Sequence, residues 1–481
     1  MNKSLPQGLD LKNVPPLSKS VITTEIIEPI VQSSATGSMV RWVLLKKGIL
    51  DVNSLIQLGV KSSSAGVSEL FFPIGTNAYS MVDRCRLKIG NNIIQSVDDF
   101  AYLGGYLDKF KGAEERSLKD FTKIGCIDVL SPSLATDGKL SLKDMNVLTV
   151  GTGDIPSPLK ITNSDDTTFL AGFRLNQLFS ILRDFAPPLF ALDEEMVIEI
   201  DLKPQATGAG DLGKVCCVGN TDKDKDTSIS YSLINTLLLV DYINFDGEIM
   251  ENISRQIFSA NGLSISFQDI LLYNSNVAAV TVAGGQLTVA QTDNTELGLG
   301  DQDVNWICMM EREADIDDEV MGRYRAQSHP APTQINMRVD DLQYLPRPVV
   351  RESEVFNYLS QVYNRPLQVH NTQYSQDAVT NKLAVSNNLG STGAYPVNQT
   401  LITGTYAGRN LAGLQGNFHY VAFDMTRDRF SRMPTRLGKK PVQFERTLLR
   451  TAADDKALEQ RFYASVMKQM TLRNGRVTVS A

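Results

Sequence analysis

The sequence contains few of the residues that most often build metal and redox sites. Its 481 residues include five cysteines, three histidines and two tryptophans. No two cysteines have the C-x-x-C spacing of a zinc site or a redox dithiol, so buried free thiols are the simplest interpretation. So few histidines also argue against a histidine-rich metal site or a histidine general base. The residues concerned are Cys85, Cys126, Cys216, Cys217 and Cys308, and His329, His370 and His419.

Long hydrophobic runs are also missing. A membrane-spanning helix needs about 20 apolar residues, whereas the longest apolar stretch, around 237–240, is interrupted by Asp241. The N-terminal stretch MNKSLPQGLDLKNVPPL lacks the charged and then apolar layout of a signal peptide. We therefore expect a protein that does not span a membrane, has no signal peptide and is made in the cell interior.

Sequence motifs of common enzyme classes are absent. The chain has no G-x-S-x-G, H-E-x-x-H or P-loop motif. VGTGDIPSPLK at 150–160 lacks the third glycine of a dinucleotide-binding loop, and its prolines would stop the helix that should hold the phosphate. DKDKD at 222–226 begins like a calcium loop, but Thr227 stands where the sharp turn needs glycine. We interpret this segment and DIDDE at 315–319 as solvated charged loops.

Two pairs of adjacent carboxylates, Asp98 with Asp99 and Asp193 with Glu194, could in principle serve a glycosidase, which needs two acids across a cleft. Sugar sites are usually also lined by stacking aromatics, but both tryptophans lie inside apparent strands, where core packing is expected. The sequence therefore predicts no catalytic, no cofactor-binding and no metal-binding residues. We expect no cofactor and no enzymatic activity.

Charge is unevenly distributed along the chain. The net charge is −7, but residues 293–319 contain ten acidic residues and one arginine, while residues 427–481 contain thirteen lysines or arginines and five acidic residues. Such asymmetry fits a nucleic-acid or membrane surface. It equally fits an acidic face of one copy that meets a basic face of another copy. The charged faces could also contact neighbouring assemblies. Solvated surfaces without a special role are the remaining interpretation.

Most of the chain alternates apolar and polar residues with the period of β-strands. Turn residues separate these stretches, and Gly90-Asn91-Asn92 and Asn474-Gly475 are strong hairpin signals. A mostly β protein with small helical insertions, either a sandwich, a barrel or a jelly roll, is therefore predicted. The predicted strands lie near 40–47, 84–90, 197–202, 232–245, 264–273, 304–310, 335–345, 419–425, 442–449 and 470–481, and the predicted helices near 97–110, 173–186, 248–258 and 353–363.

A domain boundary is indicated near residue 250. The stretch DGEIMENISRQIF has an amphipathic helical pattern and is followed by Asn261-Gly262, which is a helix stop. The N-terminal residues are proline-rich and aperiodic, and we expect them to form an extended arm that a partner orders. The predicted organisation is an arm at 1–36, a first all-β unit at 37–250, a linker helix at 251–262 and a second all-β unit at 263–481.

Three stretches carry a resemblance to a known family. LFSIL…PPLFALDEEMVIEIDL at 178–202 joins a short helix to a strand through an apolar link; LLLVDYINFDGEIMENISRQIF at 237–258 joins a strand to an acidic helix; and QRFYASVMKQMTLRNGRVTVSA at 460–481 contains an L-R-x-G hairpin. Together they resemble the double jelly-roll major capsid proteins of tailless icosahedral DNA viruses, of the polinton-like virus and virophage type. IGNNIIQSVDDFAYL at 89–103 and GKKPVQFERTLL at 438–449 fit as well, so the resemblance extends over most of 40–481.

The resemblance implies an all-β fold of two tandem eight-stranded antiparallel jelly rolls with short helical inserts. It implies a structural major capsid protein, located in the virion, whose homotrimers form pseudo-hexagonal capsomers that tile an icosahedral shell. The expected partners are other copies, neighbouring capsomers, penton and minor capsid proteins, and an internal membrane where one is present. No sequence-specific contact with nucleic acid is expected. The N-terminal arm would lie under the shell.

Two other functions remain open from the sequence. A β-sandwich carbohydrate-binding protein or glycosidase, such as a virion spike, would be a monomer or small oligomer with a sugar site and exposed aromatics. A nucleic-acid-binding protein that uses the basic C-terminal region would bind DNA with salt-sensitive affinity. The acidic total charge, and the aliphatic alternation inside that region, argue against this second alternative.

Overall fold

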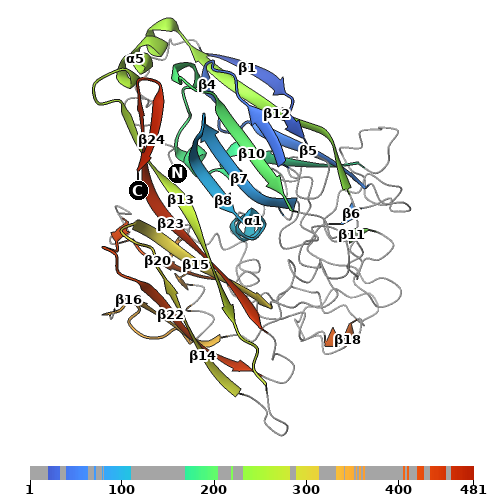
Figure 1. Cartoon of the computed structure of the whole chain (residues 1–481), viewed down its shortest axis with the longest axis vertical. Helices are drawn as coiled ribbons and strands as arrows, with labels where there is room; N and C mark the ends of the chain where they lie inside the picture. The colour runs from blue at the N-terminus through green and yellow to red at the C-terminus, as the bar shows by residue number, and fades with distance from the viewer. Residues whose placement is uncertain are drawn as a thin grey trace, which may run out of the picture.

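The chain folds into two β-sandwiches that lie against each other (Figure 1). In this computed structural model the strands of the first sandwich are coloured blue to green, and those of the second yellow to red. The structure describes residues 20–32, 39–62, 70–71, 79, 81–109, 168–203, 218–219, 231–281, 289–313, 332–340, 342–350, 354, 357–358, 361–362, 405–406, 409–410, 420–426, 434–450 and 457–480.

The first sandwich consists of two five-stranded antiparallel sheets. One sheet has the order β1-β12-β5-β9 with β4 also paired to β12, and the other has the order β2-β3-β10-β7-β8. The strands are β1 (Ser20–Ile27), β2 (Val31–Gln32), β3 (Met39–Val43), β4 (Ile49–Leu50), β5 (Leu55–Ser62), β7 (Val82–Ile89), β8 (Asn92–Asp98), β9 (Thr168–Arg174), β10 (Met196–Leu202) and β12 (Tyr231–Phe245), while β6 (Leu70–Phe71) and β11 (Val218–Gly219) pair separately.

The second sandwich consists of a six-stranded and a four-stranded sheet. The first has the order β13-β23-β15-β20, with β21 paired to β15 and β24 paired to β23, and the second has the order β14-β22-β16-β17. The strands are β13 (Leu263–Val277), β14 (Val289–Leu297), β15 (Asp303–Glu313), β16 (Pro332–Val339), β17 (Leu342–Gln343), β20 (Tyr420–Asp424), β21 (Thr435–Arg436), β22 (Val442–Arg450), β23 (Leu458–Arg473) and β24 (Arg476–Ser480), while β18 (Thr405–Tyr406) and β19 (Arg409–Asn410) pair separately.

Both sandwiches have the strand order of a jelly roll. In the first, eight strands follow one another along the chain as β1, β3, β5, β7, β8, β9, β10 and β12. Numbered in that sequence, strands 1-8-3-6 form one sheet and strands 2-7-4-5 form the other. The second sandwich repeats both orders with β13, β14, β15, β16, β17, β20, β22 and β23. This confirms the prediction of two tandem eight-stranded antiparallel jelly rolls.

The two predicted hairpin turns are present. Gly90, with φ of 57°, lies in the turn between β7 and β8, and Asn474 and Gly475, with φ of 50° and 75°, form the turn between β23 and β24. In the β23–β24 turn both turn residues have positive φ, which matches the twist of the flanking strands, and Asn and Gly are the residues that adopt it at least cost. The short-range signal was therefore sufficient to locate these turns.

The helices are short and lie at the edges of the sandwiches. The structure contains α1 (Phe100–Lys109), α3 (Leu175–Leu178), α4 (Ile181–Asp184), α5 (Gly247–Ile257) and a 3₁₀ turn (Leu189–Ala191). The single helix predicted at 173–186 is wrong, because β9 continues to Arg174 and Phe179 has extended dihedral angles that separate α3 from α4. The helix predicted at 353–363 lies largely outside the described residues.

The N-terminal boundary of the first jelly roll also differs from the expected one. Residues 20–27, which we had assigned to an arm at 1–36, form β1 and pair with β12 from Ser20–Phe245 to Ile27–Leu238. They complete the sheet because they cover the edge of β12 that β5 leaves open. The linker helix predicted at 251–262 is α5, which begins at Gly247 and ends at Ile257.

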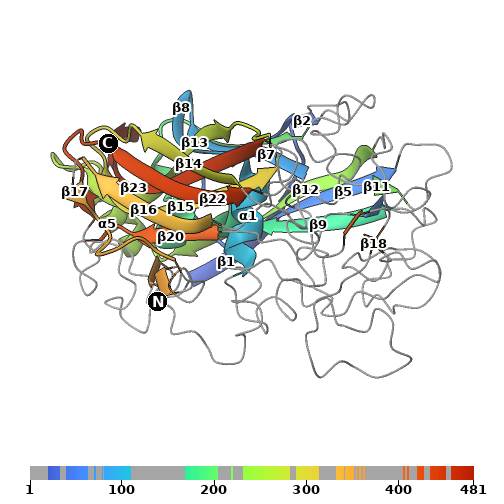
Figure 2. The same ribbon diagram turned by 90° about the horizontal axis from the view of Figure 1, so that it is seen from below.

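One hydrophobic core extends through both jelly rolls. A single cluster of buried side chains runs from Trp42 and Ile198 in the first to Phe423 and Phe462 in the second. The two units contact each other where β8 and α4 meet β13 and where β8 meets β24, and in Figure 2, the view from below, the two groups of strands overlap. Within the described part of the chain, no helix is long and apolar enough to cross a membrane.

Candidate functional site

The segments weighed for binding chemistry fall largely outside the described residues. These include all three histidines and the stretches 150–160, 222–226 and 315–319. Among the residues that the structure does describe, no group of three or more His, Cys, Asp or Glu side chains could hold a metal ion. The described cysteines, Cys85 and Cys308, are buried and are not in a disulfide, and burial raises the pKa of the Cys85 thiol. A thiol in such surroundings packs as an apolar group.

The Asp98–Asp99 pair does not form a catalytic dyad. Asp98 lies at the surface, with its carboxylate 3.7 Å from Nε of Arg84. Asp99 instead points into the contact between the two jelly rolls, where its carboxylate accepts hydrogen bonds from Nζ of Lys203, at 2.8 Å, and from Nε of Arg461. The first of these cations follows β10 and the second belongs to β23. The two carboxylates therefore have different partners and different roles.

Asp99 is an ionic junction between the two jelly rolls. Its backbone carbonyl accepts a hydrogen bond from the Tyr463 hydroxyl at 2.9 Å, and the Arg461 guanidinium lies 4.3 Å from the centre of the Tyr102 ring. Burial, the largest single effect, lowers the pKa of Arg461, but the attractions of Asp99, Tyr102, Tyr463 and Glu459 act together in the opposite direction and raise the pKa overall. The pKa of Tyr463 is raised well above its usual value, chiefly by burial. Both groups thus stay protonated at neutral pH, so each can donate to Asp99.

A second polar contact crosses the same junction. Nε2 of Gln95, in β8, donates to Oδ1 of Asp269 in β13 at 3.1 Å and to Oγ of Ser180 at 2.6 Å. Oε1 of Gln95 accepts a hydrogen bond from the backbone N–H of Ile181, so the same amide also begins α4. Asp269 in turn pairs with Lys468 at 2.6 Å. Each buried polar group in this set therefore has a partner, as buried polar groups require.

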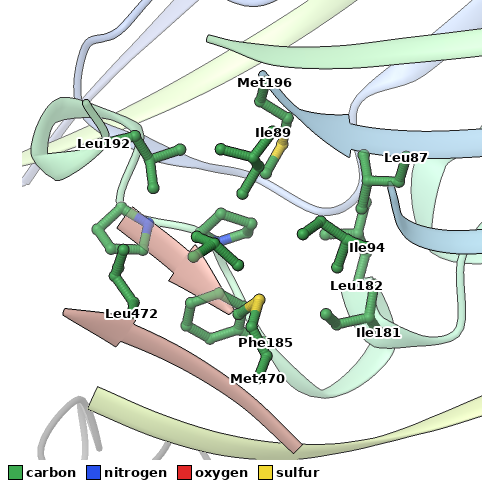
Figure 3. A pocket seen from close by; sticks show the side chains of 13 residues that line it. Leu87, Ile89, Ile94, Ile181, Leu182, Phe185, Leu192, Met196, Met470 and Leu472 are labelled. Carbon is green, nitrogen blue, oxygen red and sulfur yellow. The ribbon is translucent and has the colours of Figure 1, made fainter. Parts of the chain in front are cut away.

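Apolar side chains fill another part of the contact between the two jelly rolls. Figure 3 shows Met470 and Leu472 of β23 lining one pocket together with Ile94, Phe185 and other apolar side chains of the first jelly roll. The void left between them has about 10 Å³ and is lined by apolar residues alone. A site of this size holds at most about one water molecule. It is a packing seam and has no room for a ligand.

The acidic and basic regions of the sequence meet within one chain. Asp293 of β14 lies 3.2 Å from Nε of Arg446 in β22, and Asp301 lies 2.7 Å from a guanidinium nitrogen of Arg436 in β21. The two regions come together because β14 pairs with β22 and β15 pairs with β21. For these residues the expectation of complementary faces on different copies is therefore replaced by pairing inside the second jelly roll.

The positive charge of Arg446 lies in the interior of the second jelly roll. Its side chain is 1% exposed, and burial lowers its pKa to about 10 even though Asp293 acts in the opposite direction. A buried, paired arginine has no charge to offer to a nucleic acid. Residues 314–319 of the acidic region, and 427–433, 451–456 and 481 of the basic region, lie outside the described residues.

Three strongly exposed apolar side chains of the first jelly roll lie on its first strand. In β1, Val21, Ile22 and Ile26 are 62%, 60% and 66% exposed. β1 is also the end strand of its sheet, so one of its two backbone edges has no partner strand among the described residues. Exposed apolar strands at a sheet edge are rare in monomeric proteins because they associate readily.

Sequence reasoning missed both the ionic junction and the exposed strand. Asp99 was weighed for catalysis because it stands beside another acid, and nothing local connects it with Arg461, 362 positions later. β1 was assigned to an arm because the prolines that flank it obscure a short alternation. A search for apolar residues in a polar, proline-rich segment would have singled out Val21, Ile22 and Ile26.

The comparisons with known proteins concern the fold. No family model matches the chain, and no curated protein is similar to it in sequence. Among solved structures, VP54 of PBCV-1, fitted into a reconstruction of the virophage Sputnik, is similar with 11% identity and a TM-score of 0.52, covering 96% of this chain and 97% of its own. The mavirus major capsid protein has 8% identity and a TM-score of 0.50, with coverage of 98% and 92%.

The Faustovirus major capsid protein is similar to the same extent, with 9% identity, a TM-score of 0.50 and coverage of 95% of this chain and 91% of its own. In each case the similarity extends over both jelly rolls, because more than nine tenths of each chain is covered. The expected resemblance is thereby confirmed at the level of structure: the chain has the double jelly-roll fold found in these viral capsid proteins.

Proposed function

We propose that the protein is a structural major capsid protein of an icosahedral DNA virus and that it acts in the virion. The observation that carries the proposal is the pair of jelly rolls in one chain, aligned almost end to end with capsid proteins of large viruses and virophages. The mechanism is assembly, in which apolar area buried between copies supplies affinity and charge supplies register. No catalytic step is part of this function.

Three copies form the capsomer in this proposal. Six jelly rolls around a threefold axis give a tile with a nearly hexagonal outline, and neighbouring tiles, pentons and minor capsid proteins complete the shell. A closed ring of identical chains requires heterologous contacts, in which one surface meets a different surface on the next copy. The exposed strand β1 supports the proposal, since a monomer gains nothing from such a surface.

The proposal is tested on the purified full-length protein by size-exclusion chromatography with light scattering and by electron microscopy. We expect a species with three times the mass of one chain and flat particles with a threefold or hexagonal outline. A protein that stays monomeric at micromolar concentration, with no larger particles by microscopy, would contradict the proposal.

The segment before β1 is the proposed contact to the inside of the shell, either with a minor capsid protein or with an internal membrane. Deletion of residues 1–19 tests this role, because it leaves β1 in place, whereas deletion of 1–36 would also remove a strand of the first sheet. We expect the shorter deletion to preserve the trimer and to impair the formation of complete particles. Normal particles from the deleted protein would refute this role of the segment.

The carbohydrate-binding alternative has no support among the described residues. Trp42 is fully buried. The open depression beside the C-terminal hairpin is lined by Asp193, Thr471, Arg473, Asn474, Arg476 and Thr478, so it offers no ring on which a sugar could stack.

A further inference from the structure

The open depression beside the C-terminal hairpin is lined by polar and charged side chains. It has a volume of about 600 Å³ and is lined by Asp193, Thr471, Arg473, Asn474, Arg476 and Thr478, and we call it the hairpin depression. In Figure 1 the hairpin β23–β24 lies beside α5. The volume falls within the range of small-ligand sites, roughly 300 to 1,000 Å³. A ligand in this depression would be recognised through charge and hydrogen bonds.

Two like charges face each other across the hairpin. Arg473 of β23 and Arg476 of β24 are directly opposite each other and close the turn. Cross-strand neighbours have Cβ atoms about 5 Å apart, and like charges at that distance destabilise a hairpin. Nε of Arg476 lies 3.8 Å from the carboxylate of Asp193, whereas Arg473 forms no ion pair with a described residue. Two guanidiniums thus share one carboxylate, and a further anion would relieve their repulsion.

The neighbouring charges leave this positive excess in place. Nζ of Lys46 donates to the backbone carbonyl of Asp193 at 2.9 Å, which adds a cation at the rim of the depression. The carboxylate of Glu194 lies against Gly90 in the β7–β8 turn. Of the three consecutive acids at 193–195, only Asp193 lines the depression.

The backbone between the two arginines is held by two other segments. The carbonyl of Gly475 accepts a hydrogen bond from the N–H of Asp193 at 2.8 Å, and the N–H of Asn474 donates to the Ile257 carbonyl at the end of α5 at 3.2 Å. The two guanidiniums therefore extend from fixed positions. Such preorganisation lowers the entropic cost of binding a ligand between them.

Neutral donors lie on the same face of the hairpin. Thr471 and Thr478 are opposite each other and two residues away from Arg473 and Arg476, so all four side chains point to one face. The Thr478 hydroxyl donates to the Thr471 carbonyl at 3.5 Å, a long hydrogen bond that it can exchange for one to a ligand. The side-chain amide of Asn474 provides two further N–H donors at the tip.

We propose that the hairpin depression binds a phosphate group between the guanidiniums of Arg473 and Arg476, with Asn474 and Thr478 as additional donors. One arginine fork already satisfies both oxygens of a carboxylate, whereas a phosphate has enough oxygens for two forks. The group is either a soluble phosphate ester or the headgroup of an anionic lipid. The site goes beyond the proposed function and does not rest on it, because one chain supplies all of its residues.

The first experiment measures thermal unfolding of the full-length protein in phosphate and in chloride, at equal pH and ionic strength. A ligand that binds only the folded state stabilises it. We expect inorganic phosphate at about ten times its dissociation constant to raise the melting temperature by about 1 to 2 °C above that in chloride. Equal melting temperatures in the two salts would overturn the proposal.

Variants separate binding from the general stabilising effect of phosphate on folded proteins. In the double variant Arg473→Gln and Arg476→Gln we expect the response to phosphate to fall below that of the wild type. Its stability in chloride should be equal or higher, because the repulsion is removed. The matched control is Arg436→Gln, at an arginine that is 66% exposed and paired with Asp301, and it should respond as the wild type does. A double variant with the wild-type response would overturn the proposal.

The second experiment locates the bound group on the wild-type protein. The arginine reagent phenylglyoxal is applied with and without inorganic phosphate, and the modified peptides are identified by mass spectrometry. We expect phosphate to protect Arg473 and Arg476 and to leave Arg255, which is 71% exposed, unprotected. Equal protection of all three arginines would show that phosphate has no particular site at the hairpin and would refute the proposal.

The same mapping distinguishes the two sources of the phosphate group. Glycerol 3-phosphate in solution is compared with phosphatidylcholine vesicles that contain phosphatidic acid, and vesicles of phosphatidylcholine alone are the control. Protection by the soluble ester assigns the site to a soluble phosphate, and protection by the phosphatidic acid vesicles alone assigns it to a lipid headgroup. A DNA duplex that protects both arginines when neither phosphate source does would contradict the proposal.

Discussion

At the scale of single residues, Asp99 is a polar group that holds the two jelly rolls together. It has a positive φ of 47°, faces two cations and joins elements from both jelly rolls. Its exposure is 14%, as is that of Arg461, so removal of one partner leaves a charge with little access to water. The cost of such a removal is much larger than the loss of a surface ion pair.

We expect Asp99→Asn to lower the free energy of unfolding by about 2 kcal/mol, because Lys203 and Arg461 lose the buried carboxylate that they share. Each cation keeps one more exposed partner, Asp83 at 3.5 Å and Glu459 at 3.2 Å, which limits the loss. Asparagine accepts the positive φ, so the substitution tests the charge and leaves the backbone unstrained. Chemical denaturation followed by fluorescence measures the change.

The matched control is Asp98→Asn at the neighbouring position, where the side chain is 56% exposed and its partner Arg84 is 43% exposed. We expect a change below about 1 kcal/mol there. Equal effects of the two substitutions would show that Asp99 contributes no more than a surface charge.

The structural roles of such residues are difficult to predict from the neighbouring sequence. Asp98 and Asp99 are indistinguishable in the sequence, and the difference between them arises from partners that are distant along the chain. The same holds for Arg446, which belongs to a basic region by composition but is buried beside Asp293. Charge patterns predict a surface only when the strand pairing is known.

At the scale of elements, the sequence was most informative where a structure is local. The Asn474-Gly475 turn, the strands with clear alternation and the helix now described as α5 were all predicted near their observed positions. The segment 173–186 was misread because its apolar spacing fits a helix, whereas Phe179 adopts an extended conformation between two short turns. There the tertiary contact of Gln95 with Ile181 decides where α4 begins.

The β23–β24 turn is expected to be sensitive to its glycine. In Gly475→Ala the new Cβ would lie 2.2 Å from Oδ1 of Asp193, at a φ of 75° that alanine rarely adopts. The backbone carbonyl of Gly475 also accepts a hydrogen bond from the N–H of Asp193 at 2.8 Å, so strain would reach the junction with the first jelly roll. We expect a loss of about 1 to 3 kcal/mol, measured by thermal or chemical unfolding.

Gly298→Ala provides the matched control, since no atom lies within 4 Å of its new Cβ. We expect that change to stay within about 0.5 kcal/mol of the wild type. The interpretation of the Gly475 turn would be wrong if both alanine variants were equally stable.

At the scale of the whole molecule, the main result is that two topologically complete units share one core. The tandem organisation could be predicted from the two-residue period on both sides of residue 250, together with the resemblance to capsid proteins. The shared core could not, because it depends on side chains from both units that line one void, such as Ile94 and Phe185 from the first and Met470 and Leu472 from the second, and no local pattern reveals this proximity. Length and alternation are compatible with two independent domains.

A shared core predicts that the two jelly rolls unfold together. We expect calorimetry at low protein concentration to show one transition, with a van't Hoff enthalpy close to the calorimetric enthalpy of the whole chain. Leu472→Ala, which opens a cavity between the units, should lower the free energy of unfolding by about 2 to 4 kcal/mol and leave a single transition. Two separate transitions in the wild type would show that the units are thermodynamically independent.

The position of the β23–β24 hairpin has a consequence for biosynthesis. Asn92 and its partner Val477 are 385 positions apart. A ribosome therefore translates all strands of the first jelly roll long before it translates the β23–β24 hairpin that covers one side of it. During this interval Ile94 and Phe185 lack the side chains that cover them in the finished protein. A nascent or prematurely terminated chain therefore presents an open apolar flank to chaperones and proteases, and only a ribosome that reads past codon 477 releases a subunit fit for use.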